Sequence, residues 1–370
     1  MAQEGIIMGA FCYNGKNIKL TVEGESHSVE ISALIEGEPA VIDSIKVDEE
    51  KLQAFLDRRA PGKNAWSTPR KEPDKAIIER SSGLIFGKIV NTNTKPHDYS
   101  GLLKCPRPSH ADYTAKLKYG ESYTSSGGGS FSGRMTAPLC IAGGIALQEL
   151  NKMGINIYSH IKSIGGISDT SITSISLENQ DEFISDLAKV KSKEFPVVSD
   201  EAGDQMIELV KSLASELDSV GGVTETVITG VPGGVGGPLF DGIEGKIAGL
   251  MFAVPAVKGI EFGNGFEGST LKGSENNDNF TVVDGKVKLK TNHSGGILGG
   301  ISVGEAAPIV FSTAFKPTPS IAKTQATVDL DTMLETTIEI KGRHDPCIVP
   351  RAVPVTEAVA ALALWDMLLG

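Results

Sequence analysis

The stretch Val29-Glu30-Ile31-Ser32-Ala33-Leu34-Ile35, followed by the turn Gly37-Glu38-Pro39, bears most directly on the fold of this chain. Its β-branched and aliphatic residues partly alternate with polar residues, which is the pattern of a β-strand. A similar run occupies residues 223–228 and is followed by the turn Gly230-Val231-Pro232. This approximate repeat predicts two related halves, each built of strands and helices.

Four helices are expected, at residues 48–59, 136–153, 204–217 and 356–369. Asp48 is a suitable N-cap for the first helix, because its side chain can accept a hydrogen bond from the first turn. Gly154 closes the second, since glycine readily adopts the left-handed conformation that ends many helices. No low-complexity linker interrupts the chain, so we expect a single domain over residues 1–370.

Composition restricts the possible functions. Of the 370 residues, 40% are hydrophobic, and the formal net charge is −11. This charge argues against a general binder of nucleic acids or anionic membranes. The four cysteines form no CxxC pair, and neither a signal peptide nor a transmembrane segment is evident. We therefore expect a reduced, cytoplasmic protein without structural zinc or disulfides.

Basic residues nevertheless gather locally, as at Arg58-Arg59, which fits a small anionic ligand in a cleft; solvated surface charges are the alternative. The stretch Gly342-Arg343-His344-Asp345-Pro346 is the most informative, because its charged side chains stand among prolines and apolar residues. An arginine, an imidazole and a carboxylate on a stiff loop suit anion binding and proton transfer. A buried salt bridge between a loop and a helix would be equally compatible with this pattern.

Two histidines stand in settings that suit catalysis. His27 lies in Gly24-Glu25-Ser26-His27, directly before a predicted strand, where it could donate to an anion and titrate near neutral pH. His110 follows Arg107 by three residues and precedes Asp112, which could orient the imidazole. Either histidine could instead be a structural residue with satisfied hydrogen bonds. Structural roles are expected for His97, His160 and His293.

Two loops could contact phosphate groups. Residues 125–134 form a serine- and glycine-rich loop before a predicted helix, where backbone N–H groups attract anions and Arg134 can bind one with two hydrogen bonds. The turn Lys316-Pro317-Thr318-Pro319-Ser320 is rigid, basic and bears hydroxyls. Neither loop matches a GxGxxG or Walker A motif, and no hydrolase or metal-site motif occurs in the chain. Each loop, considered by itself, could be a simple turn.

Together these segments resemble the chorismate synthases, in the order in which that family carries them. The resemblance runs over nearly the whole chain and rests on the ordered set rather than on single motifs. Besides the motifs quoted above, it includes Asp57-Arg58-Arg59, Thr68-Pro69-Arg70-Lys71-Glu72, Ser219-Val220-Gly221-Gly222, Pro255-Ala256-Val257-Lys258-Gly259, Gly273-Ser274-Glu275 and Gly295-Gly296-Ile297-Leu298-Gly299-Gly300-Ile301.

The resemblance implies a fold, a reaction and a cofactor. The fold class is α+β: a chorismate-synthase-like β-α-β sandwich with an internal pseudo-repeat, in which helices and antiparallel sheets form layers. The reaction is the 1,4-elimination of phosphate from 5-enolpyruvylshikimate-3-phosphate to give chorismate, the last step of the shikimate pathway. This carbon-oxygen lyase reaction requires reduced FMN without net redox change, and NAD(P)H is a candidate reductant of the flavin. Such an enzyme is expected to assemble as a homotetramer.

The resemblance also implies roles for individual residues. His27, assisted by Ser26, would protonate the departing phosphate. His110 would stabilise the anionic reduced flavin, and Asp345 would mediate proton transfer near the flavin N5. The substrate's carboxylates and phosphate would be bound by Arg59, Arg134 and Arg343. The FMN site would be lined by Ser130, Phe131, Ser132, Pro255, Ala256, Gly299, Lys316, Pro317, Thr318, Pro319, Ser320 and Arg343.

Some positions depart from the usual pattern of the family. Ser130 stands where arginine or histidine is common, Ala65 replaces a frequent arginine, and the segment after Gly87 is shorter by several residues. Retention of the catalytic candidates favours an active lyase. Two other functions remain open: an FMN-dependent oxidoreductase with its own NAD(P)H site, and a catalytically silent relative that binds flavin or a phosphometabolite.

Overall fold

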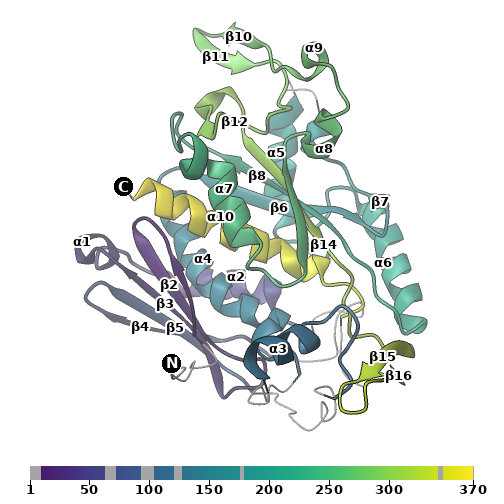
Figure 1. Ribbon diagram of the computed structural model, residues 1–370. Helices are drawn as coiled ribbons and strands as arrows, with labels where there is room; N and C mark the ends of the chain where they lie inside the picture. Colours follow the sequence, from purple (N-terminus) through teal and green to yellow (C-terminus); the bar gives the residue numbers. More distant parts are fainter. Residues whose placement is uncertain are drawn as a thin grey trace.

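The computed structural model describes residues 10–62, 72–92, 104–120, 127–175, 179–340 and 345–369. Two antiparallel five-stranded sheets enclose a layer of long helices (Figure 1). The architecture is therefore α+β with sheets and helices in layers, as the sequence predicts. No helix in these described ranges combines the length and the apolar character needed to cross a membrane.

The first sheet is built around the strand expected from the opening stretch of sequence. Its order is β1-β2-β3-β5-β4. The strands are β1 (Ala10–Asn14), β2 (Ile18–Gly24), β3 (Glu30–Gly37), β4 (Ala76–Ser81) and β5 (Leu84–Val90). Ile31, Ala33 and Ile35 on alternate positions of β3 are almost completely buried. The alternation therefore directs one face of β3 toward the helical layer.

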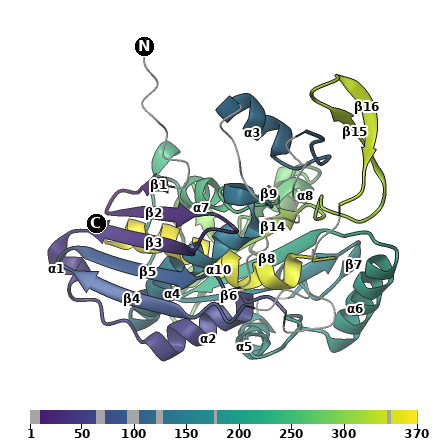
Figure 2. The same cartoon turned by 90° about the horizontal axis from the view of Figure 1, so that it is seen from below.

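The second sheet has the order β7-β6-β8-β14-β9. Its strands are β6 (Asn156–Ile164), β7 (Ile167–Ser168), β8 (Gly222–Thr229), β9 (Val257–Phe262) and β14 (Ile309–Phe315). The predicted strand at 223–228 is β8. The helices α5 (Gln180–Val190) and α6 (Asp200–Ser215) lie on the outer side of this sheet (Figure 2). Phe183 and Leu187 of α5 form a small core there with Val227 and Val310.

The helical layer consists of α2 (Glu49–Arg59), α4 (Thr136–Lys152), α7 (Ile243–Met251) and α10 (Val349–Leu368). α4 packs against β3 and β5 of the first sheet, and α10 packs against β6 and β8 of the second. The two helices approach closely, because a Cβ at Gly143 would lie 2.4 Å from the Cβ of Ala358. One continuous hydrophobic core therefore spans both sheets.

The expected helix boundaries agree with the structure at α2 and α4 and differ at α6 and α10. Asp48 caps α2 by accepting a hydrogen bond from the Lys51 N–H. α6 begins four residues earlier than predicted, because the Ser199 side chain caps it. The prediction that the last helix starts at Thr356 is wrong, since it starts at Val349. Pro350 fits the first turn, where no N–H is needed, and Pro354 is accommodated within the helix.

The C-terminal end of α10 is anchored to the first sheet. The buried carboxylate of Asp366 accepts hydrogen bonds from the backbone N–H groups of Lys16, Asn17 and Ile18 at 2.7–2.9 Å. It also accepts one from the Tyr13 hydroxyl at 3.1 Å. The turn between β1 and β2 is thereby fixed to the end of the central helix.

Smaller elements connect these layers. They are α1 (Pro39–Ile42), α3 (Asp112–Tyr119), α8 (Gly265–Gly268), α9 (Gly273–Asn276) and the hairpins β10 (Phe280–Val283) with β11 (Lys286–Leu289), β12 (Ile297–Leu298) with β13 (Ile301–Ser302), and β15 (Gln325–Asp329) with β16 (Leu334–Ile338). Short 3-10 turns are η3 (Gly129–Phe131), η4 (Gly133–Met135), η5 (Ile172–Ser174), η7 (Leu239–Asp241) and η8 (Gly304–Ala306). α3 and the β15–β16 hairpin project on the same side of the molecule (Figure 2).

Candidate active site

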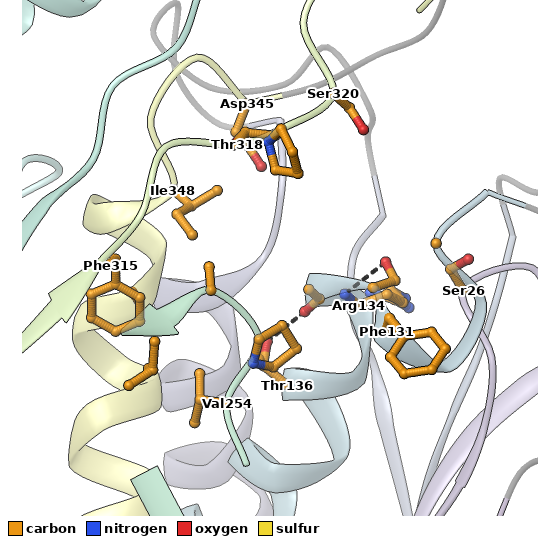
Figure 3. A pocket seen from close by; sticks show the side chains of 18 of the residues that line it. Ser26, Phe131, Arg134, Thr136, Val254, Phe315, Thr318, Ser320, Asp345 and Ile348 are labelled. Atoms are coloured by element: carbon orange, nitrogen blue, oxygen red, sulfur yellow. Dashed lines mark hydrogen bonds between the residues drawn. The ribbon is translucent and has the colours of Figure 1, made fainter. Parts of the chain in front are cut away.

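A cavity of about 540 Å³ lies where loops of both halves meet the first turns of α10. Its walls come from the segment after β2, the end of α2, the loops before α3 and α4, the connection from α7 to β9, and the segment after β14. In Figure 3, Arg134 lies close to Ser26 and Phe131, whereas Val254, Phe315 and Ile348 lie toward the other side. A cavity of this size with polar and apolar walls suits a ligand of cofactor size.

His110 is held at this cavity by a carboxylate. Its Nδ1 lies 2.7 Å from Asp112 Oδ1. Asp112 also accepts hydrogen bonds from Arg107 Nε and Nη2, each at 2.7 Å. Burial opposes ionisation of this carboxyl, but the hydrogen bonds from Arg107 and His110 hold the pKa of Asp112 well below its usual range. Asp112 is therefore a carboxylate that orients the imidazole, as the sequence spacing predicts.

The surrounding hydrogen bonds also fix the tautomer of His110. The two hydrogens of Arg107 Nη2 are used by Asp112 Oδ1 and by the Gly127 carbonyl at 2.8 Å. The 3.0 Å contact between Arg107 Nη2 and His110 Nδ1 therefore has no hydrogen to share. Nδ1 consequently carries a proton and donates it to Asp112. The other ring nitrogen, Nε2, remains for a ligand in the cavity.

His27 lines the same cavity and lies against the glycine loop. A Cβ at Gly127 would stand 2.8 Å from His27 Nε2 and 3.4 Å from Ser26 Oγ. Gly127 also has a φ of +68°, which side-chain-bearing residues adopt only with strain. Because its carbonyl accepts a hydrogen bond from Arg107, this glycine connects the surroundings of His27 with those of His110.

Each of the three guanidinium nitrogens of Arg59 donates one hydrogen bond to the protein. Nε donates to Thr136 Oγ1 at 3.0 Å, Nη2 donates to the Gly133 carbonyl at 3.1 Å, and Nη1 donates to Asp74 Oδ2 at 2.5 Å. Burial lowers the pKa of Arg59 to about 10, against the opposing effect of Asp74. Arg59 thus reaches the cavity wall with all three of its nitrogens already bonded.

The guanidinium of Arg134 is engaged through Nε and Nη1. Nε donates to Asn91 Oδ1 at 3.0 Å, and Nη1 donates to Asp74 Oδ1. Nη2 is buried and has no hydrogen-bond partner among the residues that the structure describes. Because Arg134 lines the cavity, this nitrogen can bind an acceptor group of a ligand.

Asp345 and Arg351 form an ion pair at the start of α10. Arg351 Nη1 donates to Asp345 Oδ2 at 2.5 Å, and Arg351 Nε donates to the Arg59 carbonyl at 3.0 Å. Both side chains line the cavity. The alternative of a salt bridge between a loop and a helix therefore describes part of this stretch correctly, and the same pair also contributes to the cavity wall.

The far wall combines apolar side chains with two lysines. Val254, Phe315 and Ile348 contribute apolar surface, and Lys258 and Lys316 contribute positive charge. Burial, together with the neighbouring charge of Lys258, lowers the pKa of Lys316. This wall suits a ligand that has both a flat apolar part and an anionic group.

Comparison with known proteins identifies the family of this chain. A sequence model of the chorismate synthase family matches residues 18–369. The chain is 44% identical to the chorismate synthase of Lancefieldella parvula over 96% of this chain and 95% of that protein. It is 43% identical to the chorismate synthase of Pyrococcus abyssi over 96% and 97% of the two chains.

The chain belongs to the chorismate synthase family. Chorismate synthases are lyases that act on phosphates, and this enzyme class follows for the chain. A crystal structure of a chorismate synthase superposes with a TM-score of 0.71 at 24% identity, covering 96% of this chain and 92% of the other. That likeness supports the fold.

Most of the site residues that the chorismate synthase resemblance implies line this 540 Å³ cavity. They are Ser26, His27, Arg59, His110, Ser130, Phe131, Ser132, Arg134, Pro255, Ala256, Lys316, Thr318, Pro319, Ser320 and Asp345. Pro317 stands between two lining residues but does not itself line the cavity. Gly299 lies in the turn between β12 and β13, away from the cavity lining. Arg343, Ala65 and His97 lie outside the described residues.

Sequence reasoning missed several residues in and around this cavity. Asp74 joins two cavity arginines, yet it follows the recognised motif by two residues and carries no signal of its own. The sequence indicates Arg107 only as a nearby charge, although Arg107 donates hydrogen bonds to Asp112, to the Gly127 carbonyl and, at 3.1 Å, to Ser320 Oγ. The apolar wall has no local motif, because its residues come from separate elements.

Proposed function

We propose that this protein converts 5-enolpyruvylshikimate-3-phosphate to chorismate by 1,4-elimination of phosphate, with reduced FMN as cofactor, as the last step of the shikimate pathway. The observation that carries the proposal is that His27, His110 and Asp345 line one cavity with a wall rich in arginine and lysine. Both the substrate and the cofactor are polyanions. Membership of the chorismate synthase family supports the same reaction.

The residues at the cavity fit FMN. Val254, Phe315 and Ile348 offer apolar contact to a flavin ring, and Lys258 and Lys316 offer positive charge to its phosphate. Thr318 Oγ1 is buried without a hydrogen-bond partner in the described part of the chain, and its residue lines the cavity. An unsatisfied buried hydroxyl is costly unless a ligand completes it. Reduced FMN, when bound, would supply electron density to the substrate as phosphate leaves.

His27 is proposed to protonate the departing phosphate. An imidazolium neutralises charge that develops on the leaving group and supplies a proton to it, which is general acid catalysis. Ser26, which lines the cavity beside it, is proposed to assist by hydrogen bonding. The glycine at 127 leaves the space that the His27 ring needs.

His110 is proposed to stabilise negative charge on the bound flavin. Asp112 holds the Nδ1 proton, so a proton taken up on Nε2 would create a donor directed at a ligand. Asp345, paired with Arg351, is proposed to mediate proton transfer at the flavin N5. The substrate's anionic groups are assigned to Arg59, Arg134 and Arg343.

Anaerobic assay tests this proposal directly. The protein is mixed with 5-enolpyruvylshikimate-3-phosphate and dithionite-reduced FMN, and phosphate release is followed in parallel with chorismate absorbance. We expect one phosphate for each chorismate. A folded protein that binds FMN and forms neither product would instead be the silent relative, and rapid NADPH oxidation with free FMN but without chorismate would indicate an oxidoreductase.

We also propose that the enzyme is a cytoplasmic homotetramer in which residues 1–370 form a single domain. The continuous core shared by the two sheets supports the single domain. Light scattering coupled to size-exclusion chromatography measures the assembly, and a mass of four chains is expected. NAD(P)H remains a candidate reductant of the flavin, which flavin reduction under anaerobic conditions would test.

A further inference from the structure

Asp74 lies directly behind the cavity, between two of its arginines. One carboxylate oxygen, Oδ2, accepts from Arg59 Nη1 at 2.5 Å, and the other, Oδ1, accepts from Arg134 Nη1. Asp74 is 1% exposed and does not itself line the cavity. It comes from the segment before β4, whereas the arginines come from the end of α2 and from η4. A single carboxylate thus connects three parts of the chain.

The two arginines present different surfaces to a ligand. Arg59 uses each nitrogen on a protein acceptor. Arg134 keeps Nη2 without a hydrogen-bond partner within the described ranges, although the atom is buried. A buried guanidinium N–H without an acceptor is costly, and an anionic ligand removes that cost. Arg134 is therefore the better direct contact for an anion, and Arg59 is the better support.

The negative charge of Asp74 allows the guanidinium groups of Arg59 and Arg134 to be buried close together. Two buried guanidinium groups at short range repel one another, and each carries a desolvation penalty. The shared carboxylate offsets both effects, and the two arginines in turn lower the pKa of Asp74 against the effect of its burial. Arg134 Nε is held separately by Asn91 Oδ1 and also forms an ion pair with the buried carboxylate of Glu72, whose Oε2 lies 3.5 Å away. Two edges of the Arg134 guanidinium are thus fixed, which sets the direction of Nη2.

We propose that Asp74 is a positioning residue for substrate binding, which holds Arg134 so that its Nη2 donates to an anionic group of the substrate. This inference rests on the proposed function, because it takes 5-enolpyruvylshikimate-3-phosphate as the ligand. It refines the roles first assigned to Arg59 and Arg134, since Arg59 supports the network and Arg134 contacts the anion directly.

The backbone conformation at Asp74 allows a substitution that removes the charge without disturbing the fold. Its φ is +46°, in the left-handed region, where asparagine and aspartate are the side-chain-bearing residues most easily tolerated. Asp74→Asn therefore keeps the backbone conformation and the side-chain size while removing the charge and one acceptor. Asp169→Asn is the matched control, because Asp169 is also a buried carboxylate with a basic partner, His160, but does not line the cavity.

The experiment measures two affinities, that of the substrate on the FMN-saturated protein and that of FMN on the FMN-free protein. Titration calorimetry with oxidised FMN, which does not support turnover, gives the dissociation constant of 5-enolpyruvylshikimate-3-phosphate, and a separate titration gives that of FMN. Asp74→Asn is expected to weaken substrate binding by at least about tenfold, the loss expected for a misdirected charged hydrogen bond. FMN binding is expected to change by less than about threefold, roughly 0.6 kcal/mol. Asp169→Asn should leave both affinities unchanged while lowering the thermal midpoint.

A double-mutant cycle separates positioning from a general structural effect. If Asp74 acts through Arg134, adding Asp74→Asn to Arg134→Lys should cost almost nothing further in substrate affinity. Additive losses, or equal weakening of FMN and substrate, would overturn the positioning role. Unchanged substrate affinity in Asp74→Asn, with a wild type that binds and turns over substrate, would overturn this inference alone. A wild type that does not bind the substrate would overturn the proposed function and this inference together.

Discussion

His110 and His160 are both held by carboxylates, but they differ in how many ring nitrogens are used. His110 lines the cavity, and its Nδ1 is hydrogen-bonded to Asp112 Oδ1 at 2.7 Å. His160 is completely buried in β6, with Nδ1 3.2 Å from Asp169 and Nε2 3.2 Å from Glu225. A ring with one nitrogen left over can exchange a proton with a ligand. A ring whose two nitrogens both bond carboxylates is held as a cation and has no nitrogen left for a ligand.

The carboxylates around His160 are also fully satisfied. Asp169 accepts from the Val198 and Ser199 N–H groups at 2.6 and 2.9 Å. Glu225 accepts from the Ile172 N–H at 2.9 Å and from the Ser171 hydroxyl. Although burial acts against the charged ring, the hydrogen bonds to both carboxylates raise the pKa of His160 to about 9. The comparison shows that a shifted pKa without a ligand-facing atom indicates stability rather than catalysis.

The strongest test of this comparison is His110→Ala. Loss of the cavity imidazole should lower turnover by about 10²–10³-fold, the usual cost of removing a group that stabilises developing negative charge. Circular dichroism and the thermal midpoint should stay close to wild type, because the ring is at the cavity surface. The matched control is His293→Ala, whose ring bonds the Asn276 carbonyl outside the cavity and whose loss should leave turnover intact. An unchanged rate in His110→Ala would remove its assigned role.

His160→Ala should show the opposite pattern. Removing the ring leaves Asp169 and Glu225 buried without their shared cation, which costs about 3–5 kcal/mol. Urea unfolding measures this loss as a shift of the midpoint. The KM for substrate should be unchanged at temperatures where the variant remains folded. A loss of turnover in the folded variant would show that the two histidine networks do not differ in the way proposed.

The pH dependence of stability sharpens the comparison further. The folded-state pKa of His160, about 9, lies above its ordinary value of 6.5. The stabilisation is therefore fully present below about pH 6.5 and is lost as the pH rises through about 9, up to roughly 3 kcal/mol. Unfolding free energies of the wild type and His160→Gln at pH 6.5 and 9.5 isolate this contribution. If the unfolding free energy falls equally in the wild type and in His160→Gln between pH 6.5 and 9.5, the contribution of His160 is contradicted.

Gly127→Ala should have the smallest effect and a specific one. The new Cβ would meet His27 Nε2 at 2.8 Å and would also strain a backbone with φ of +68°. Gly285→Ala is the control, because its φ is +76° but no atom lies within 4 Å of the added Cβ. Both variants should lose about 1–2 kcal/mol of stability. Only Gly127→Ala should also lower turnover, by about tenfold, and equal rates would show that the contact with His27 is unimportant.

Local signals in the sequence predicted the elements whose boundaries are set locally. Asp48 caps α2 because an aspartate at that position satisfies the first turn whatever surrounds it. The start of α10 was mispredicted because Pro350 and Pro354 are breakers by local rules. Burial of the helix between two sheets outweighs that cost, and only the tertiary structure reveals it.

The same distinction applies to the site. His110 and Asp112 are two residues apart, so their contact could be inferred from spacing. Asp74 is 60 residues from Arg134, and the apolar wall draws Val254 and Ile348 from separate segments. Such contacts depend on how the chain is folded. Most of the residues that the family resemblance assigned to the site line the cavity, whereas their hydrogen-bond partners required the structure.

The central position of α10 affects the order in which the protein can be made. The helix occupies residues 349–368 and is buried between both sheets, and Asp366 near its end holds the turn between β1 and β2. A ribosome therefore produces every strand of both sheets before α10 emerges. α4 can cover the first sheet early, but the face of the second sheet against which α10 packs stays exposed in the nascent chain until then, which makes this period the most vulnerable to aggregation. Growth temperature and chaperone supply should therefore influence the yield of this enzyme more than the stability of the finished fold would suggest.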